Sequence, residues 1–173
     1  MRALFFCSAC SGIAPEYNEA ARELVRAAAS RGYEIVSGGT VKGTMGVICE
    51  EAAACGAKVR GVLPRFMEPL VHPALTDTEW TETMSERKEA MRKGADVVFA
   101  LPGGIGTMDE LFETLVLAKL GRYYGRIAAV NIGGFYDPLD KLLEHFVATG
   151  MLEPADRARL LMPKTVEEAI ALL

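Results

Sequence analysis

The sequence lacks the features that mark membrane proteins and nucleic-acid-binding proteins. No apolar run among its 173 residues approaches the roughly 20 residues that a membrane-spanning helix needs. Basic residues do not exceed acidic ones, because 19 Lys and Arg stand against 23 Asp and Glu and leave a net charge of −4. We therefore expect neither a membrane partner nor a nucleic-acid partner. The short apolar start, residues 1–7, is interpreted as a first strand and not as a leader, and we expect a cytoplasmic protein.

Histidine and cysteine are too few, and too poorly spaced, for a metal or redox centre. The chain has two histidines and four cysteines. Cys7 and Cys10 form a C-x-x-C, but this pair closes a predicted strand, whereas a redox-active pair of this kind opens a helix. Cys49 and Cys55 lie six residues apart on a predicted helix and so do not share a face. A zinc site would need two more ligands. We expect reduced thiols and no metal.

Strand-like and helix-like segments alternate along the whole chain. Half of the residues are apolar, which suffices for one core, and we expect a single domain over residues 1–173. Short apolar runs predict strands at residues 3–7, 33–36, 58–63, 96–101, 126–131 and 160–163. Amphipathic spacing and terminal glycines predict helices at residues 17–31, 44–55, 83–92, 107–120, 138–147 and 166–173, the last capped by Thr165.

This alternation is typical of an α/β protein, in which helices cover both faces of a parallel sheet. The longest segment without a clear period is residues 64–80, which contains three prolines. We expect it to be irregular and to lie over the carboxyl edge of the sheet, where ligands bind in such folds.

Two glycine-rich turns follow predicted strands, SGGTVKGT at residues 37–44 and LPGGIGT at residues 101–107. Glycines let backbone N–H groups approach a ligand closely, and a helix start attracts negative charge, so such turns suit a phosphate. Neither turn is a Walker loop, and the dinucleotide fingerprint fails because Asp109 stands where a third glycine would follow Gly104 and Gly106. A small phosphorylated ligand, such as a mononucleotide, remains. The alternative is that both turns are only tight connections.

Arg87 lies in an apolar stripe of the helix predicted at residues 83–92. It is spaced at i+3 from Met84 and at i−4 from Met91, while Arg92 falls outside this stripe. A buried guanidinium needs an anion, either a carboxylate of the protein or a phosphate of a ligand. Lys88 is adjacent and can reach the same region.

Glu110 has two interpretations. A carboxylate in a first helical turn gains about 0.3–1 kcal/mol from the helix dipole, which would explain Asp109 and Glu110 alike. If the glycines hold a 5′-phosphate, Glu110 lies within reach of the sugar and can stabilise an oxocarbenium-like transition state or activate water. Asp109 points about 100° away around the helix, toward a sugar hydroxyl or toward solvent.

Two motifs together resemble one family. MSERKEAM at residues 84–91 and LPGGIGTMDE at residues 101–110 are similar to the paired R-K-x-x-M and P-G-G-x-G-T-x-x-E motifs of the Lonely Guy family of phosphoribohydrolases. The resemblance implies a Rossmann-like fold, a homodimer and no metal or organic cofactor. It also implies hydrolysis of the N-glycosidic bond of a nucleoside 5′-monophosphate, either an N6-modified AMP such as isopentenyladenosine monophosphate, or AMP itself.

The resemblance also implies roles for individual residues. Arg87 and Glu110 match the catalytic pair. The expected substrate-binding residues are Gly103, Gly104, Gly106 and Thr107 around the phosphate, with Lys88, Asp109, Gly39 and Met84. Glu68 is a further candidate ligand contact.

The chain departs from the family pattern at Thr40, where a Gly is usual, and at Thr44, where a Leu is usual, which leaves the preferred base open. The alternative function is a non-catalytic protein that binds a nucleotide or another phosphorylated ligand. The lysine decarboxylase label carried by some members has no support here, since no pyridoxal-phosphate lysine context is recognisable.

Overall fold

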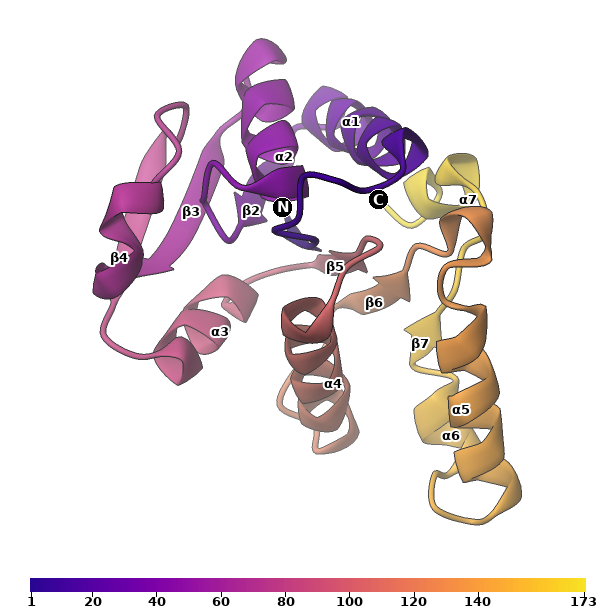
Figure 1. Ribbon diagram of the computed structural model, residues 1–173. Coiled ribbons are helices and arrows are strands. Elements are labelled where there is room, and N and C mark those ends of the chain that lie inside the picture. Colours follow the sequence, from indigo (N-terminus) through magenta and orange to yellow (C-terminus); the bar gives the residue numbers. More distant parts are fainter.

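Seven strands form one parallel sheet in the computed structural model, which describes residues 1–173 (Figure 1). The strands are β1 (Arg2–Phe6), β2 (Glu34–Ser37), β3 (Val59–Pro64), β4 (Asp77–Thr81), β5 (Val97–Ala100), β6 (Arg126–Ala129) and β7 (Leu160–Leu161). Their order across the sheet is β4-β3-β2-β1-β5-β6-β7, and every neighbouring pair is parallel. The prediction of an α/β fold with a parallel sheet is confirmed.

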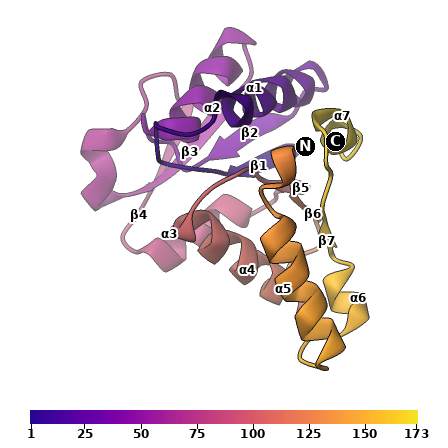
Figure 2. The ribbon, with the colours of Figure 1, turned by 45° about the vertical axis from the view of Figure 1, so that its right-hand side comes forward.

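Helices cover both faces of this sheet. They are α1 (Pro15–Ser30), α2 (Gly43–Ala54), α3 (Met84–Arg92), α4 (Ile105–Lys119), α5 (Asp137–Ala148), α6 (Pro154–Arg157) and α7 (Val166–Ile170), with 3-10 turns η1 (Arg65–Leu70) and η2 (Ile132–Gly134). Helices α1, α2 and α7 lie on one face, and α3, α4 and α5 lie on the other, with α6 beside α5 (Figure 2). None of the helices is both long enough and apolar enough to cross a bilayer.

The central strands are apolar on both sides because each contributes side chains to two hydrophobic cores, one on each face of the sheet. In β1, Ala3 and Phe5 point into the cluster under α1 and α2, whereas Leu4 and Phe6 point into the cluster under α4 and α5. All four side chains are at most 1% exposed. A strand has a side-chain period of two, so a strand covered on both faces reads as a continuous apolar run. This explains why short apolar runs identified the inner strands.

The order of the strands reverses between β1 and β5. From β1 the chain moves outward through β2, β3 and β4, and it then returns to β5 on the other side of β1. The loops that follow β1 and β5 therefore run in opposite directions and leave a crevice at the carboxyl ends of these two strands, where ligands bind in open parallel sheets. The second predicted phosphate turn, residues 101–107, opens into this crevice.

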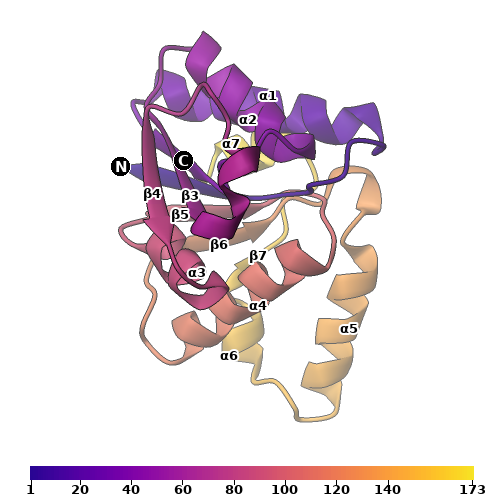
Figure 3. The ribbon, with the colours of Figure 1, turned by 60° about the vertical axis from the view of Figure 1, so that its left-hand side comes forward.

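The prediction that residues 64–80 are irregular is wrong, because they contain η1 and the edge strand β4 (Figure 3). β4 reads DTEWT and pairs only with β3, so most of its side chains are partly exposed and it lacks an apolar run. Helix α6 was not predicted either. The predicted cap of the last helix is confirmed, since the Thr165 side chain accepts a hydrogen bond from the Glu168 N–H.

We expect Gly39→Ala to destabilise the fold more than Gly56→Ala does. Both glycines have a left-handed backbone, with φ of 69° and 66°, and strain of about 1–2 kcal/mol from this source applies to both. A Cβ at position 39 would also lie 2.7 Å from the Gly61 Cα, whereas nothing lies within 4 Å at position 56. We expect this overpacking to add about 1–3 kcal/mol to the loss in free energy of unfolding, measured by urea denaturation. Equal losses in both variants would contradict close packing at Gly39.

Candidate active site

The turn after β5 presents a row of unpaired backbone donors. The N–H groups of residues 103–107 have no hydrogen-bond acceptor within the protein, and the first N–H that is satisfied is that of Met108, which donates to the Gly104 carbonyl at 3.0 Å. These donors lie at the start of α4, a helix of 15 residues. Unpaired N–H groups and the positive end of a helix dipole together favour a phosphate. We call residues 103–107 the glycine cradle.

Gly103 and Thr107 fix the shape of the glycine cradle. A Cβ on Gly103 would lie 2.1 Å from the Thr107 hydroxyl oxygen, so only glycine fits there. The Thr107 hydroxyl is buried and donates to the Cys7 carbonyl at 3.0 Å, which ties the start of α4 to the end of β1 across the crevice. Because its hydroxyl proton is used inside the protein, the backbone N–H of Thr107 is the donor that remains for a ligand. Its role as a phosphate contact stays a prediction.

Arg87 is buried, as the sequence predicted, and its anion partner in the structure is Glu110. The guanidinium is held from two sides: Nε donates to the Val62 carbonyl at 2.9 Å, and Nη1 donates to Glu110 Oε1 at 3.1 Å. The Arg87 and Glu110 residues are only 6% and 8% exposed. A Cβ on Gly38 would lie 2.3 Å from Arg87 Nη2, so the glycine leaves the space that the guanidinium occupies.

Glu110 lies in the second turn of α4, because the helix begins at Ile105 and not at Thr107 as predicted. The helix dipole acts mainly on the first turn, so it explains Glu110 poorly. Burial raises the pKa of the Glu110 carboxyl to about 7, and the neighbouring Asp109 charge adds to this effect, while Arg87 opposes it. The site thus holds a carboxyl that changes charge near neutral pH.

Cys7 lies beside this pair and is buried. Burial raises the pKa of its thiol well above the usual value, and the Glu110 charge adds to the shift. The thiol is therefore uncharged at neutral pH. All four cysteines are unpaired.

Lys88 and Asp109 form a second ion pair next to Arg87 and Glu110. Lys88 Nζ lies 2.9 Å from Asp109 Oδ2 and 3.5 Å from Glu113 Oε2. The Asp109 side chain is 55% exposed, as the interpretation of a solvated group expects, and it also pairs with Lys88. Its contact with a sugar hydroxyl stays a prediction, as does the support that Lys88 gives to substrate binding.

The remaining residues predicted to contact the ligand differ in how far they are buried. Met84 is the first residue of α3, is 42% exposed and stands almost one helical turn before Arg87. Gly39 is buried against Gly61, and its N–H donates to the Ser37 hydroxyl. Glu68 lies exposed in η1. Ligand contacts by these three residues stay predictions.

Close packing accounts for the glycines of the first turn, residues 37–44. Gly38 makes room for Arg87, Gly39 packs on β3, and a Cβ on Gly43 would lie 2.6 Å from the Cys10 carbonyl oxygen. The glycines of this turn are therefore explained by its being a tight connection, and they do not require a ligand.

Arg92 is buried although it lies outside the apolar stripe of α3. It is 8% exposed and pairs with Glu113 of α4. A signal for this contact exists in the sequence, since Lys88 and Arg92 are spaced at i,i+4 while Glu110 and Glu113 are spaced at i,i+3. Each pair therefore lines one helix face. Nothing in the sequence shows that these two faces meet.

Comparisons with known proteins identify relatives of this chain. A family model described as "Possible lysine decarboxylase" matches residues 45–173. A cytokinin riboside 5′-monophosphate phosphoribohydrolase of Rhodococcoides fascians is 34% identical over 169 residues, covering 96% of this chain and 85% of that protein. One of Oryza sativa subsp. japonica is 31% identical over 171 residues, covering 98% and 71%.

Among solved structures, the molybdenum cofactor binding protein from Rippkaea orientalis shares the fold, with a TM-score of 0.74, 20% identity and coverage of 99% of this chain and 94% of that one. The similarity in sequence extends over nearly the whole chain and includes both motifs of the site. The chain therefore belongs to the Lonely Guy family of cytokinin riboside 5′-monophosphate phosphoribohydrolases, whose family model carries the description possible lysine decarboxylase.

Proposed function

We propose that the protein hydrolyses the N-glycosidic bond of a nucleoside 5′-monophosphate and releases the free base and ribose 5-phosphate. The observation that carries the proposal is the buried Arg87–Glu110 pair, which lies one helical turn from the unpaired donors of the glycine cradle. The names of the family members support the same class of reaction.

The glycine cradle binds the 5′-phosphate in this proposal. Five successive N–H groups without protein acceptors are already oriented, so little conformational freedom is lost on binding. The phosphate does not react, and its binding energy holds the ribose against the ion pair, where the bond breaks.

Glu110 then acts on the sugar. As the bond between C1′ and the base breaks, its electron pair leaves with the base and positive charge develops on the ribose. The Glu110 carboxylate stabilises this charge and directs a water molecule to C1′, where a new C–O bond forms; the proton released by the water ends on the base. Arg87 orients Glu110 and binds a ribose or phosphate oxygen.

The proposed substrates are N6-modified AMP, such as isopentenyladenosine monophosphate, and AMP. Thr40 and Thr44, which depart from the family pattern, are both buried. The Thr44 hydroxyl donates to Asn18 of α1 at 2.9 Å, and the Thr40 hydroxyl to the Met45 sulfur. Both hydroxyls thus bond within the protein, and we propose that these two departures influence the choice of base through packing. The protein is further proposed to be a single-domain, cytoplasmic homodimer, and sedimentation velocity tests the dimer.

A second candidate is a non-catalytic protein that binds a phosphorylated ligand. The glycine cradle alone would serve such a protein, and the fold is shared with a molybdenum cofactor binding protein. A pure binder gains little from a buried carboxyl beside a phosphate, so the Arg87–Glu110 pair favours the hydrolase. Lysine decarboxylation gains no support, because Lys88, the lysine beside the site, is paired with Asp109.

We expect Glu110→Gln and Arg87→Ala each to lower kcat by at least about 100-fold, since each removes half of the charge arrangement around C1′. Release of base and ribose 5-phosphate from AMP and from isopentenyladenosine monophosphate is followed by chromatography. Glu89→Gln is the control, because Glu89 is exposed on α3 and forms no ion pair. A wild type that binds these nucleotides tightly without turnover would instead support the carrier, and one that neither binds nor cleaves them would contradict both functions.

Activity should rise with pH through the neutral range. The pKa of Glu110 is raised by burial to about 7, and only the ionised form stabilises positive charge on the ribose. We therefore expect kcat/KM, which reports the free enzyme, to increase between pH 6 and pH 8 with an apparent pKa of about 7, and the residual activity of Glu110→Gln to lack this step. A kcat/KM that falls over this range would show that Glu110 works as a proton donor.

A further inference from the structure

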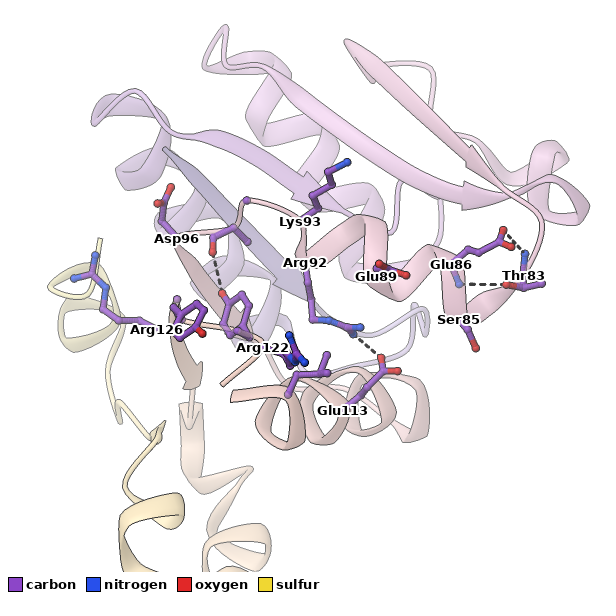
Figure 4. Close-up of a pocket in the computed structure, with 16 residues that line it drawn as sticks. Thr83, Ser85, Glu86, Glu89, Arg92, Lys93, Asp96, Glu113, Arg122 and Arg126 are labelled. Carbon is purple, nitrogen blue, oxygen red and sulfur yellow. Dashed lines mark hydrogen bonds and ion pairs between the residues drawn. The ribbon is translucent and has the colours of Figure 1, made fainter. Parts of the chain in front are cut away.

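Arg92, which is buried, and Glu113, which is 34% exposed, form a second contact between α3 and α4. It lies about one turn further along both helices than the Arg87–Glu110 pair, at a groove of about 1180 Å³ on the outer side of α3. Figure 4 shows Arg92 reaching from α3 toward Glu113, which points back from α4. Arg92 Nη1 lies 2.5 Å from Glu113 Oε2, and the Arg92 side chain is only 8% exposed.

Glu113 contacts two cations of α3. Besides Arg92 it lies 3.5 Å from Lys88 Nζ, and Lys88 in turn pairs with Asp109 at 2.9 Å. The ion pairs between the two helices thus comprise a connected chain, from Arg92 through Glu113 and Lys88 to Asp109. The separate Arg87–Glu110 pair lies beside this chain, since Arg87 precedes Lys88 and Glu110 follows Asp109. We call the chain and this pair together the α3–α4 ladder; its members are Arg87, Lys88, Arg92, Asp109, Glu110 and Glu113.

Helices α3 and α4 share one apolar cluster, to which α3 contributes Met91 and α4 contributes Leu111. Helix α3 packs mainly on β3 and β4, and α4 packs on β1, whereas the backbones of α3 and α4 make few close approaches to each other. Long charged side chains that meet between the two helices therefore contribute to their separation. Arg87 is on one of these helices and Glu110 is on the other, so the same separation sets the distance across the reacting pair.

We propose that Glu113 is a positioning residue: by holding Arg92 and Lys88 it fixes α3 and α4 at the separation where Arg87 meets Glu110. This inference rests on the proposed hydrolase function. A buried Arg92 without Glu113 is an uncompensated charge, which is strongly unfavourable. The other carboxylates that α4 turns toward α3 are Asp109 and Glu110, so Arg92 and Lys88 would compete for the groups of the site itself.

The test compares Glu113→Gln with Glu89→Gln, which removes a carboxylate from the same groove but breaks no ion pair. A misplacement of about 1 Å at a reacting pair can cost up to about 100-fold in rate, so we expect kcat of Glu113→Gln to fall at least about 10-fold. Because this substitution leaves the glycine cradle unchanged, KM should change much less than kcat. Glu89→Gln should keep the wild-type kcat. A wild-type kcat in Glu113→Gln overturns the positioning role.

A double variant, Arg92→Met with Glu113→Leu, separates positioning from stability. It removes both charges, so no buried charge is left unpaired, and the melting temperature should return toward that of the wild type even if Glu113→Gln folds poorly. We expect kcat to stay low, since apolar side chains do not hold Lys88 or the helix separation. Recovery of kcat together with stability would show a merely structural pair. An inactive wild type overturns the proposed function and the positioning role with it, whereas an active wild type with unaffected variants overturns the positioning role alone.

Discussion

The buried contact between Arg87 and Glu110 is the constraint on which the site depends. Two charges removed from water are tolerated only when both are compensated by well-placed partners. Here the Val62 carbonyl accepts the second donor of the guanidinium, and Gly38 leaves the volume that it fills. One ion pair thus depends on a carbonyl of β3, on a glycine of the turn after β2 and on side chains of two helices. None of these elements is adjacent to the others in sequence.

The order of the strands and helices brings these parts together. β5 lies beside β1 at the point where the strand order reverses, and α3 and α4 are the helices before and after β5. The cation is therefore supplied by the helix that enters β5, and the glycine cradle and the carboxylate by the helix that leaves it. The Thr107 hydroxyl bonded to the Cys7 carbonyl ties this unit to β1. The glycine cradle and the Glu110 carboxyl are thereby placed about one turn apart on the same helix.

Sequence patterns identified the parts that depend on local periodicity. The inner strands, the main helices, the glycine turn after β5 and the burial of Arg87 all follow from the period of apolar residues and from glycine positions. β4 was missed because an edge strand is half-exposed and needs no apolar run. The burial of Arg92 and the reason for Gly38 were missed for another cause. A helical wheel places a side chain relative to its own helix, whereas these two residues are explained by what another element brings against them.

The balance of forces on Glu110 supports the proposal that the pair serves chemistry and not stability. A carboxyl that stabilised the fold as an anion would have a lowered pKa, but burial outweighs Arg87 and raises the pKa of Glu110 to about 7. Folding then favours the protonated form, and this contribution to stability is present below the usual pKa of 4.5 and is lost as the pH rises to about 7. At neutral pH the ionised pair therefore costs the protein stability. Ionisable groups kept at such a cost, beside a row of unpaired backbone donors, are typical of functional sites, which supports the proposed role of the pair.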